Sequence, residues 1–297
     1  MNANSRLLKQ ALLRHQPALF AKANVLGVGI GEQVTAGRAT GRICLKVYVE
    51  KKLPRSKLAF KNFIPPTLGT VLTDVEEVGK IRAFSNTSRQ RPATGGVSIG
   101  HYKVTAGTLG CLVTDHKRRK QLILSNNHVL ADSNRAKLGD PILQPGKYDG
   151  GKLGRDTLAT LLRFEKIRFR GEPNVVDCAL AEPVNASLVS SEIFEIGVPK
   201  GTVAARRGMS LQKSGRTTGY TLGKVKDVDV SIKVDYDGKT GLFSNQILTT
   251  AMSQGGDSGS LVLNDHKQAV GLLFAGSDAV TLLNPIKMVL ETLGVTL

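Results

Sequence analysis

The run GGDSGS at residues 255–260 places Ser258 in a setting that suits nucleophilic chemistry. A serine hydroxyl is a weak nucleophile at neutral pH, so it needs a base, a group that orients the base, and donors for the oxyanion that forms. Because glycine has no side chain, Gly256 lets the backbone turn the amides of Gly256 and Ser258 toward a single oxygen. The same letters also occur in ordinary surface turns, so the run alone leaves both interpretations open.

The base would be one of the five histidines. His128 ends an apolar run, so a buried strand would deliver its ring to a short polar turn and fix the ring by packing. His15 lies in a helical pattern, and His116 and His266 lie in charged turns. The sequence does not exclude His101 as a second candidate base. A core histidine satisfied by the backbone is the structural alternative for His128.

The acid that orients the base should be at least partly buried. Asp177 fits, because it stands among small and apolar residues in the run VVDCALA at 175–181. An unpaired buried charge is costly, so an acid at this position needs a partner. Beside a histidine, its task would be to hold one tautomer and to stabilise the imidazolium. Asp140 and Asp156 lie in polar, glycine-containing loops and are weaker candidates.

The elements that must hold these residues are predicted to be strands. After residue 96, short runs rich in Val, Ile, Leu and Thr alternate with glycine-containing turns, which is typical of an all-β sandwich or barrel. Near the end, the pattern predicts a helix over 284–293, with Asn284 as its cap and Pro285 in its first turn. The expected strands include 110–114, 121–124, 175–181, 223–234, 246–250, 261–263 and 269–275.

The N-terminal part is predicted to be a small, separate α+β unit. Residues 85–96 are polar and poor in apolar side chains, which is typical of a linker. We therefore expect an N-terminal unit over residues 1–90 and a larger domain over 91–297. The expected N-terminal elements are a helix over about 4–20, from apolar residues at helical spacing, and strands near 24–31, 43–49 and 71–78.

The chain is strongly basic, with 41 Lys and Arg against 24 Asp and Glu and a net charge of +17. Such an excess favours contact with nucleic acid or another acidic partner. The densest clusters lie at 117–120, 163–170 and 206–207, but the charge is otherwise scattered, so a solvated basic surface is the simpler interpretation. With 5% aromatic residues, no stacking platform for single-stranded nucleic acid is apparent.

The three cysteines, Cys44, Cys111 and Cys178, do not form a disulfide framework, because they are few and odd in number. Each lies in an apolar run, so we expect buried thiols. The first twenty residues contain no uninterrupted apolar segment of signal-peptide length, and no stretch is long enough for a membrane helix. These observations predict a reducing, cytoplasmic location and no membrane partner. We expect no cofactor and no metal.

The order His128, Asp177, Ser258 resembles that of the trypsin-like (chymotrypsin-fold) serine peptidases, in particular the bacterial type. The strings SNNHV at 125–129 and DCAL at 177–180 carry the resemblance together with GDSGS, and it covers about residues 95–297. The N-terminal unit is similar to the leader portion of uncharacterised bacterial trypsin-like peptidases. The resemblance implies a mainly β fold of two six-stranded barrels, preceded by the α+β unit and followed by a C-terminal helix.

In the mechanism that this resemblance implies, the three residues lie in the cleft between the barrels. His128 and Asp177 would belong to the first barrel and Ser258 to the second. Ser258 would attack a carbonyl while His128 takes and later returns the proton and Asp177 holds the ring. The amides of Gly256 and Ser258 would bind the oxyanion.

The acid next to the nucleophile, Asp257, is where the chain departs from the animal enzymes. Those enzymes pair this acid with a freed amino terminus, but no activation cleavage site is evident here. The run SGRTTGY at 214–220 resembles the corresponding stretch of bacterial family members. We therefore expect Arg216 to pair with Asp257 and to keep the site formed at all times. A simple role in a β-turn is the structural alternative for Arg216.

The primary specificity pocket is expected from alignment with the family. Met252 and Ser253 would form one wall, and Phe274, Ala275 and Gly276 the other. No acid is expected at the base of this pocket. The sequence therefore favours a small or apolar substrate side chain over Lys or Arg.

The function predicted is that of a serine endopeptidase acting on protein or peptide substrates. One alternative is a non-catalytic basic protein that uses a peptidase scaffold to hold nucleic acid or an acidic partner. Another is an esterase that uses the same three residues. The N-terminal unit carries no recognisable chemistry, and its role stays open between a pro-region, a docking module and a cover over the cleft.

Overall fold

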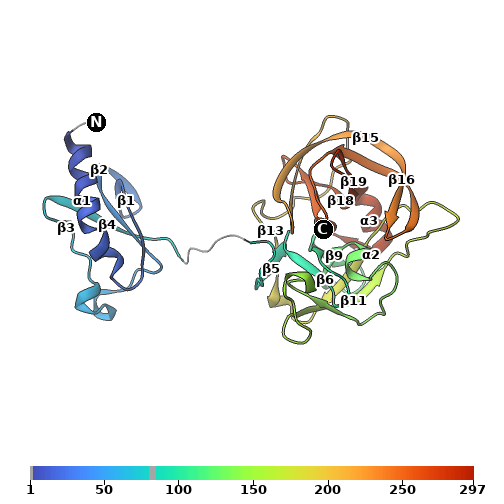
Figure 1. The fold of residues 1–297 in the computed structure, drawn as a ribbon, viewed down its shortest axis with the longest axis horizontal. Helices are drawn as coiled ribbons and strands as arrows, with labels where there is room; N and C mark the ends of the chain where they lie inside the picture. Colours follow the sequence, from blue (N-terminus) through green and yellow to red (C-terminus); the bar gives the residue numbers. More distant parts are fainter. Residues whose placement is uncertain (1–2, 80–84) are drawn as a thin grey trace. The chain divides into compact units, whose positions relative to one another are not determined.

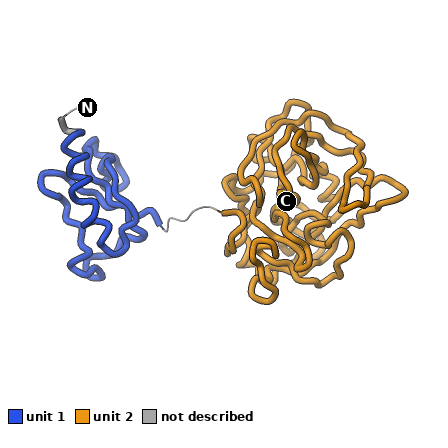
Figure 2. Tube along the Cα trace, in the orientation of Figure 1, with its two compact units in different colours: residues 1–84 blue, residues 85–297 orange. Residues whose placement is uncertain are grey.

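The computed structural model describes residues 3–79 and 85–297. The chain divides into two compact units, residues 1–84 and 85–297 (Figure 2). The first unit combines one long helix with a small sheet, and the second is built mainly from strands (Figure 1). Among the residues described, no helix is both long and apolar enough to cross a membrane.

The segment predicted to be a linker is part of the second unit. Asn86 Nδ2 donates to the carbonyl of Gly215 at 2.8 Å, and the amide of Gln90 donates to Gln144 Oε1 at 2.9 Å. Further along, the strand β5 (Ala93–Gly95) is fully buried. Because Asn86 and Gln90 bond to residues of the second unit, this unit begins at residue 85 rather than at the predicted residue 91.

In the first unit, α1 (Ala3–Phe20) packs on a four-stranded sheet of order β1-β2-β4-β3. Leu8 of the helix, Leu45 of β2 and Val71 of β4 form the buried core. The helix and the three predicted strands are present, and one short strand is added. The elements after α1 are β1 (Val25–Thr35), β2 (Arg38–Val49), η1 (Arg55–Lys57), η2 (Phe60–Asn62), β3 (Thr67–Leu68) and β4 (Val71–Glu77).

The glycines at alternate positions of β1 make room for side chains of the neighbouring strand β2. A Cβ atom on Gly31 would lie 2.9 Å from Lys46 Cγ, and one on Gly27 would lie 3.2 Å from Tyr48 Cδ2. Lys46 is thereby buried, and its Nζ pairs with Asp74 at 2.7 Å. The glycine pattern therefore serves packing within the sheet.

The second unit contains a closed barrel of six strands, in the order β14-β15-β16-β19-β18-β17. A second sheet has eight strands, in the order β20-β8-β9-β12-β11-β10-β6-β7, where the family resemblance implied six, and a small third sheet pairs β13 (Val189–Ile193) with β5. Two of the eight are two-residue strands, β7 (Gly107–Thr108) and β20 (Val295–Thr296). The mainly β, two-barrel fold predicted from the sequence is confirmed.

The remaining elements of the second unit follow in chain order. Those of the eight-stranded sheet and its loops are β6 (Ser98–His101), β8 (Cys111–Asp115), β9 (Gln121–Ser125), α2 (Asn127–Leu130), β10 (Pro141–Leu143), η3 (Lys147–Asp149), β11 (Thr157–Phe164), β12 (Ala179–Pro183) and η4 (Ala186–Leu188). Those of the closed barrel are β14 (Ser210–Gly215), β15 (Gly219–Tyr236), β16 (Lys239–Thr250), β17 (Leu261–Asn264), β18 (Ala269–Gly276) and β19 (Val280–Pro285).

The C-terminal helix α3 (Ile286–Leu293) joins the two larger sheets of the second unit through one buried core. Val289 of the helix belongs to the same apolar cluster as Leu122 of β9 and Leu272 of β18. After the helix, β20 pairs with β8, so the chain returns from the closed barrel to the eight-stranded sheet. The shared core fixes the two sheets relative to each other, so that residues from both can meet at one site.

Candidate active site

His128 lies in α2, a single helical turn that follows β9 directly. Its neighbours Asn127 and Val129 are buried, which anchors the turn, while the His128 side chain keeps 22% of its surface exposed. The ring lines a cavity with a volume of about 750 Å³. His101, the other candidate base, is fully buried and bonds through Nε2 to Asp140 at 3.0 Å, and it does not line this cavity.

Asp177 is completely buried and holds the ring of His128 by a short hydrogen bond. His128 Nδ1 lies 2.6 Å from Asp177 Oδ2. The same oxygen accepts a bond from the hydroxyl of Tyr236 at 2.9 Å. The other oxygen, Oδ1, accepts the amides of Asn127 at 2.7 Å and of His128 at 3.3 Å. The buried carboxylate therefore has four donors, which offset the cost of its burial.

The backbone of Asp177 is held by two asparagines. Asn284 Oδ1 accepts the amide of Asp177 at 2.9 Å, and Asn126 Nδ2 donates to the carbonyl of Asp177 at 2.7 Å. Asn284 itself donates to Gln246 Oε1 at 2.7 Å. The predicted role of Asn284 as the cap of the last helix is wrong, because the N-cap residue is Pro285 and the Asn284 side chain is engaged with Asp177.

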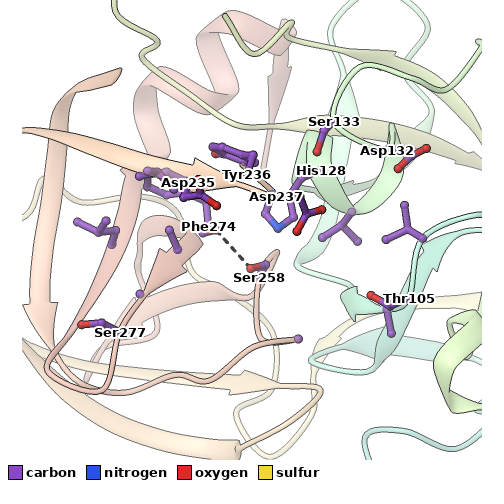
Figure 3. A pocket seen from close by; sticks show the side chains of 18 of the residues that line it. Thr105, His128, Asp132, Ser133, Asp235, Tyr236, Asp237, Ser258, Phe274 and Ser277 are labelled. Carbon is purple, nitrogen blue, oxygen red and sulfur yellow. Dashed lines mark hydrogen bonds between the residues drawn. The ribbon is translucent and has the colours of Figure 1, made fainter. Parts of the chain in front are cut away.

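Ser258 lines the same cavity as His128, from the closed-barrel side (Figure 3). Its hydroxyl donates to the carbonyl of Phe274 at 3.3 Å, the dashed line in Figure 3. Within the described part of the chain, no hydrogen bond joins Ser258 to His128. Because Nδ1 of His128 faces Asp177, the ring nitrogen left for Ser258 is Nε2.

Two threonines fix the loop that precedes Ser258. Thr217 Oγ1 donates to the carbonyl of Gly255 at 2.7 Å, and Thr108 Oγ1 donates to the carbonyl of Gly256 at 2.9 Å. Gly256 has a φ of +98°, which favours glycine, and a Cβ atom there would lie 2.4 Å from Thr217 Oγ1.

The amides of Gly256 and Ser258 are available for a ligand. Among the described residues, neither amide donates to a protein acceptor. The carbonyl of Gly255 points to Thr217, and the N–H of a trans peptide points opposite to its C=O, so the Gly256 amide faces away from Thr217. The loop therefore presents two free donors next to the hydroxyl, the arrangement that stabilises a developing oxyanion.

The cation that pairs with Asp257 is Lys213, so the predicted pairing with Arg216 is wrong. Lys213 Nζ lies 3.3 Å from Asp257 Oδ2, and both side chains are completely buried. Lys213 also donates to Thr218 Oγ1 and to the carbonyl of Gly219. Burial lowers the pKa of Lys213 from its ordinary value, while the nearby Asp257 acts in the opposite direction.

Asp257 receives further donors from the turn after β14. Oδ1 accepts the amides of Thr217 at 2.8 Å and Thr218 at 3.1 Å, and Oδ2 accepts the Thr218 hydroxyl at 2.6 Å. The amide of Gln254 adds a bond at 3.0 Å. A buried carboxylate that is satisfied on both oxygens fixes the backbone on either side of it, which here includes Gly256 and Ser258.

Arg216 lies nearby but bonds to Asp149 of η3. Its Nε donates to Asp149 Oδ2 at 2.8 Å, and its Nη2 donates to Asp149 Oδ1. This hydrogen-bonded carboxylate raises the pKa of Arg216 above its ordinary value. Asp149 also accepts the Ser98 hydroxyl at 2.6 Å, so Arg216 links the closed barrel to the eight-stranded sheet, while its Nη1 donates to Thr217 Oγ1 at 3.0 Å.

A second, smaller cavity of about 220 Å³ adjoins Ser258. Of the five residues predicted to form a specificity pocket, Ser253, Ala275 and Gly276 line it. Phe274 lines the larger cavity instead, and Met252 is buried in the barrel core and lines neither. Asp278, an acid not expected from the sequence, also lines this cavity. The full lining is Ser253, Gln254, Gly255, Ser258, Leu273, Ala275, Gly276, Ser277 and Asp278.

The larger cavity carries charges of both signs on its walls. The charged residues that line it are Lys103, Asp132, Arg135, Lys233, Asp235 and Asp237. Several of these come from the end of β15, next to Tyr236 (Figure 3). Among the residues described, no group of three or more His, Cys, Asp or Glu is placed to hold a metal ion.

Comparison with known proteins identifies the fold. No protein-family model matches the chain, and no curated protein matches its sequence. Thermobifida fusca Protease A matches over 68% of this chain and 96% of its own, with a TM-score of 0.50 and 21% identity. Nocardiopsis protease matches over 68% and 97%, with a TM-score of 0.50 and 17% identity.

A third solved structure, a glutamic acid specific serine protease, gives a similar result. It matches over 69% of this chain and 100% of its own, with a TM-score of 0.50 and 22% identity. The chain thus has the chymotrypsin-like fold of bacterial serine proteases, as the order of His128, Asp177 and Ser258 led us to expect.

Proposed function

We propose that the second unit is a serine endopeptidase that cleaves protein or peptide substrates. The observation that carries the proposal is the 2.6 Å bond between His128 and Asp177, with His128 and Ser258 lining one cavity. The fold is shared with three solved serine proteases, which adds support. A base held in one tautomer beside an accessible serine is the arrangement that acyl transfer requires.

The proposed reaction begins when the hydroxyl of Ser258 turns from the Phe274 carbonyl to His128 Nε2. The hydroxyl then attacks the substrate carbonyl and its proton passes to Nε2, while Asp177 stabilises the imidazolium through Nδ1. The tetrahedral oxyanion accepts bonds from the amides of Gly256 and Ser258. His128 gives the proton to the leaving amine, and an acyl-enzyme remains on Ser258. Water then repeats the sequence and releases the acid.

The Lys213–Asp257 pair would keep this site formed without any cleavage of the chain. Its cation is supplied by β14 of the same barrel, and the serine loop is further held by Thr108 and Thr217. The site is therefore proposed to be competent in the intact chain, as we expected from the sequence, although with a different cation.

A fluorophosphonate probe tests the proposal, because it labels only a serine activated by a base. The wild-type protein should be labelled, and Ser258→Ala and His128→Ala should not. Ser277→Ala is a matched control, because Ser277 lines the same cavities but has no base beside it. Absence of labelling in the wild type would overturn the proposal. Salt-dependent retention on DNA in that case would favour the basic binding protein instead.

A further inference from the structure

Tyr236 brings the tip of the β15–β16 hairpin to the candidate acid. It is the last residue of β15 and pairs with Lys239 at the start of β16, so it lies at the hairpin turn. The hairpin belongs to the closed barrel, whereas Asp177 lies two residues before the start of β12 in the eight-stranded sheet. The hydroxyl of Tyr236 donates to Asp177 Oδ2 at 2.9 Å.

Aromatic side chains hold the ring of Tyr236 in place. Phe169 packs edge-on at 5.8 Å and Phe243 stacks at 6.1 Å between ring centroids. The His128 ring meets Tyr236 edge-on at 5.8 Å, with an interplanar angle of 70°. Such contacts have preferred geometries, so they fix where the hydroxyl points. The ring thus contacts the base while the hydroxyl contacts the acid.

The hydroxyl of Tyr236 is a donor over the whole working range of pH. Burial, followed by the nearby Asp177 carboxylate, raises the pKa of Tyr236 well above its ordinary value. The proton therefore stays on the phenol oxygen. Since a carboxylate only accepts hydrogen bonds, the direction of this bond is fixed.

We propose that Tyr236 is a positioning residue, which orients the Asp177 carboxylate and sets how strongly it binds the His128 ring. The backbone amides of Asn127 and His128 hold Oδ1, but Oδ2 has two donors among the residues that the structure describes, the His128 ring and Tyr236. The phenol therefore shares with His128 the oxygen that must stabilise the imidazolium. This inference rests on the proposed peptidase function.

Few other titratable groups bear on this bond. Cys178 follows Asp177, and burial, with the Asp177 charge, raises the pKa of its thiol, so it stays neutral. The charged residues lining the cavity are Lys103, Asp132, Arg135, Lys233, Asp235 and Asp237, and His128 is the one histidine among its lining residues.

The test is Tyr236→Phe in the full-length protein, which removes the hydroxyl and keeps the ring. Tyr220→Phe is the matched control, because Tyr220 lies on the same strand and its hydroxyl bonds to Gln212, away from the site. We expect Tyr236→Phe to lower kcat by about ten-fold with KM unchanged, because the Asp177 carboxylate loses an anchor and no longer holds the His128 ring in one orientation.

The pH dependence separates positioning from a structural role. With one donor fewer on Oδ2, Asp177 accepts the Nδ1–H of His128 as a stronger hydrogen bond. The acidic limb of fluorophosphonate labelling should therefore move to higher pH in Tyr236→Phe and not in Tyr220→Phe. A lower melting temperature with an unchanged limb and unchanged kcat would show a merely structural role and overturn the inference.

A proton NMR measurement keeps the inference separate from the proposed function. The His128 Nδ1 proton, in its short bond to Asp177, resonates at low field and can be observed in Ser258→Ala as well. Tyr236→Phe should shift this resonance whether or not the protein cleaves peptides, and an unshifted resonance would overturn the positioning role. If Tyr236→Phe does not fold, slow exchange of the wild-type Tyr236 hydroxyl proton supports the bond, and fast exchange contradicts it.

Discussion

Lys213 and Asp257 form an ion pair in which neither side chain reaches solvent. Each charge in such a pair depends on the other, because removing one partner leaves an uncompensated charge in a desolvated site, at a cost of about 3–5 kcal/mol. Asp257 lies between Gly256 and Ser258. Loss of its partner would therefore destabilise the backbone that carries the candidate nucleophile and the two free amides.

We predict that Lys213→Met lowers the free energy of unfolding by about 3–5 kcal/mol and abolishes fluorophosphonate labelling of Ser258. Lys224→Met is the control, because Lys224 is an exposed lysine on the neighbouring strand β15, and it should leave both quantities unchanged. Urea unfolding and probe labelling measure the two effects. Arg216→Met should retain labelling, since Arg216 bonds to Asp149; loss of labelling there alone would contradict the assignment of Lys213.

Asp278 changes what the smaller cavity is expected to bind. The sequence favoured a small or apolar substrate side chain because no acid was expected there, but Asp278 lines this cavity. A carboxylate at the wall of a pocket attracts a basic side chain. We therefore predict that Asp278→Asn lowers kcat/KM about ten-fold for a peptide with Lys or Arg before the cleaved bond, and hardly changes it for an Ala peptide.

Asp265→Asn is the control for this charge change, because Asp265 is exposed and lines neither cavity. Paired measurements of kcat/KM on the two peptides give the ratio for each variant. Equal losses on the basic and the Ala peptides in Asp278→Asn would rule out a role in charge recognition.

The loop between η3 and β11 is held by a buried carboxylate with two arginine partners and a backbone amide donor. Asp156 accepts Arg155 Nη2 at 2.6 Å, the amide of Lys152 at 2.9 Å, and Arg89 Nε at 3.1 Å. The bond from Arg155 is the main cause that lowers the pKa of Asp156, and Arg89 contributes. Through Arg89, this loop holds the first residues of the second unit, which begins at residue 85.

The lowered pKa of Asp156 makes the stability of this loop depend on pH. A carboxyl group with a lower pKa in the folded state stabilises the protein above its unfolded pKa, near 4, and loses this contribution as the pH falls further. We predict that Asp156→Asn is less stable than the wild type at pH 7 and that the difference shrinks toward pH 2. Urea unfolding at pH 7, 4 and 2 measures it, with Asp265→Asn as the control.

The positions of the strands and of the three candidate catalytic residues could be predicted because their signals are local. Alternation of apolar side chains identifies a strand, and His128, Asp177 and Ser258 each stand in a short pattern of their own. The partners of these residues could not be predicted, because they are distant in sequence. Lys213 is separated from Asp257 by 44 residues, and Tyr236 from Asp177 by 59.

One signal for Lys213 was present in the sequence. In β14, Lys213 is two positions from Leu211, and alternate residues of a strand face the same side, so a buried Leu211 places Lys213 inside the barrel. No comparable signal exists for Tyr236, because β15 alternates between exposed and partly buried residues along most of its length. Its contact with Asp177 depends on how the two sheets pack.

The two units of the chain each have a core of their own. The core of the first contains Leu8, Leu45 and Val71, and four apolar clusters lie wholly in the second. A unit with its own core and satisfied backbone can fold alone. The three proposed catalytic residues, His128, Asp177 and Ser258, all belong to the second unit.

We therefore predict that residues 85–297 alone fold and are labelled by the fluorophosphonate probe. Residues 91–297 should melt several degrees lower, because they lack the bonds made by Asn86, Arg89 and Gln90. Each net hydrogen bond contributes about 1 kcal/mol, and 1 kcal/mol shifts the melting temperature by about 2–4 °C in a domain of this size. Equal melting temperatures would contradict the boundary at residue 85.

Asp177 takes its supports from both larger sheets of the second unit. The amide of Asn127 comes from the eight-stranded sheet, whereas Tyr236 and Asn284 come from the closed barrel. Since a ribosome delivers the chain from its N-terminus, a nascent chain holds His128 and Asp177 before either of those later partners has been made. If the unit is the peptidase we propose, its site would be completed only after the closed barrel has been synthesised, so an incomplete chain would not cleave itself or its neighbours.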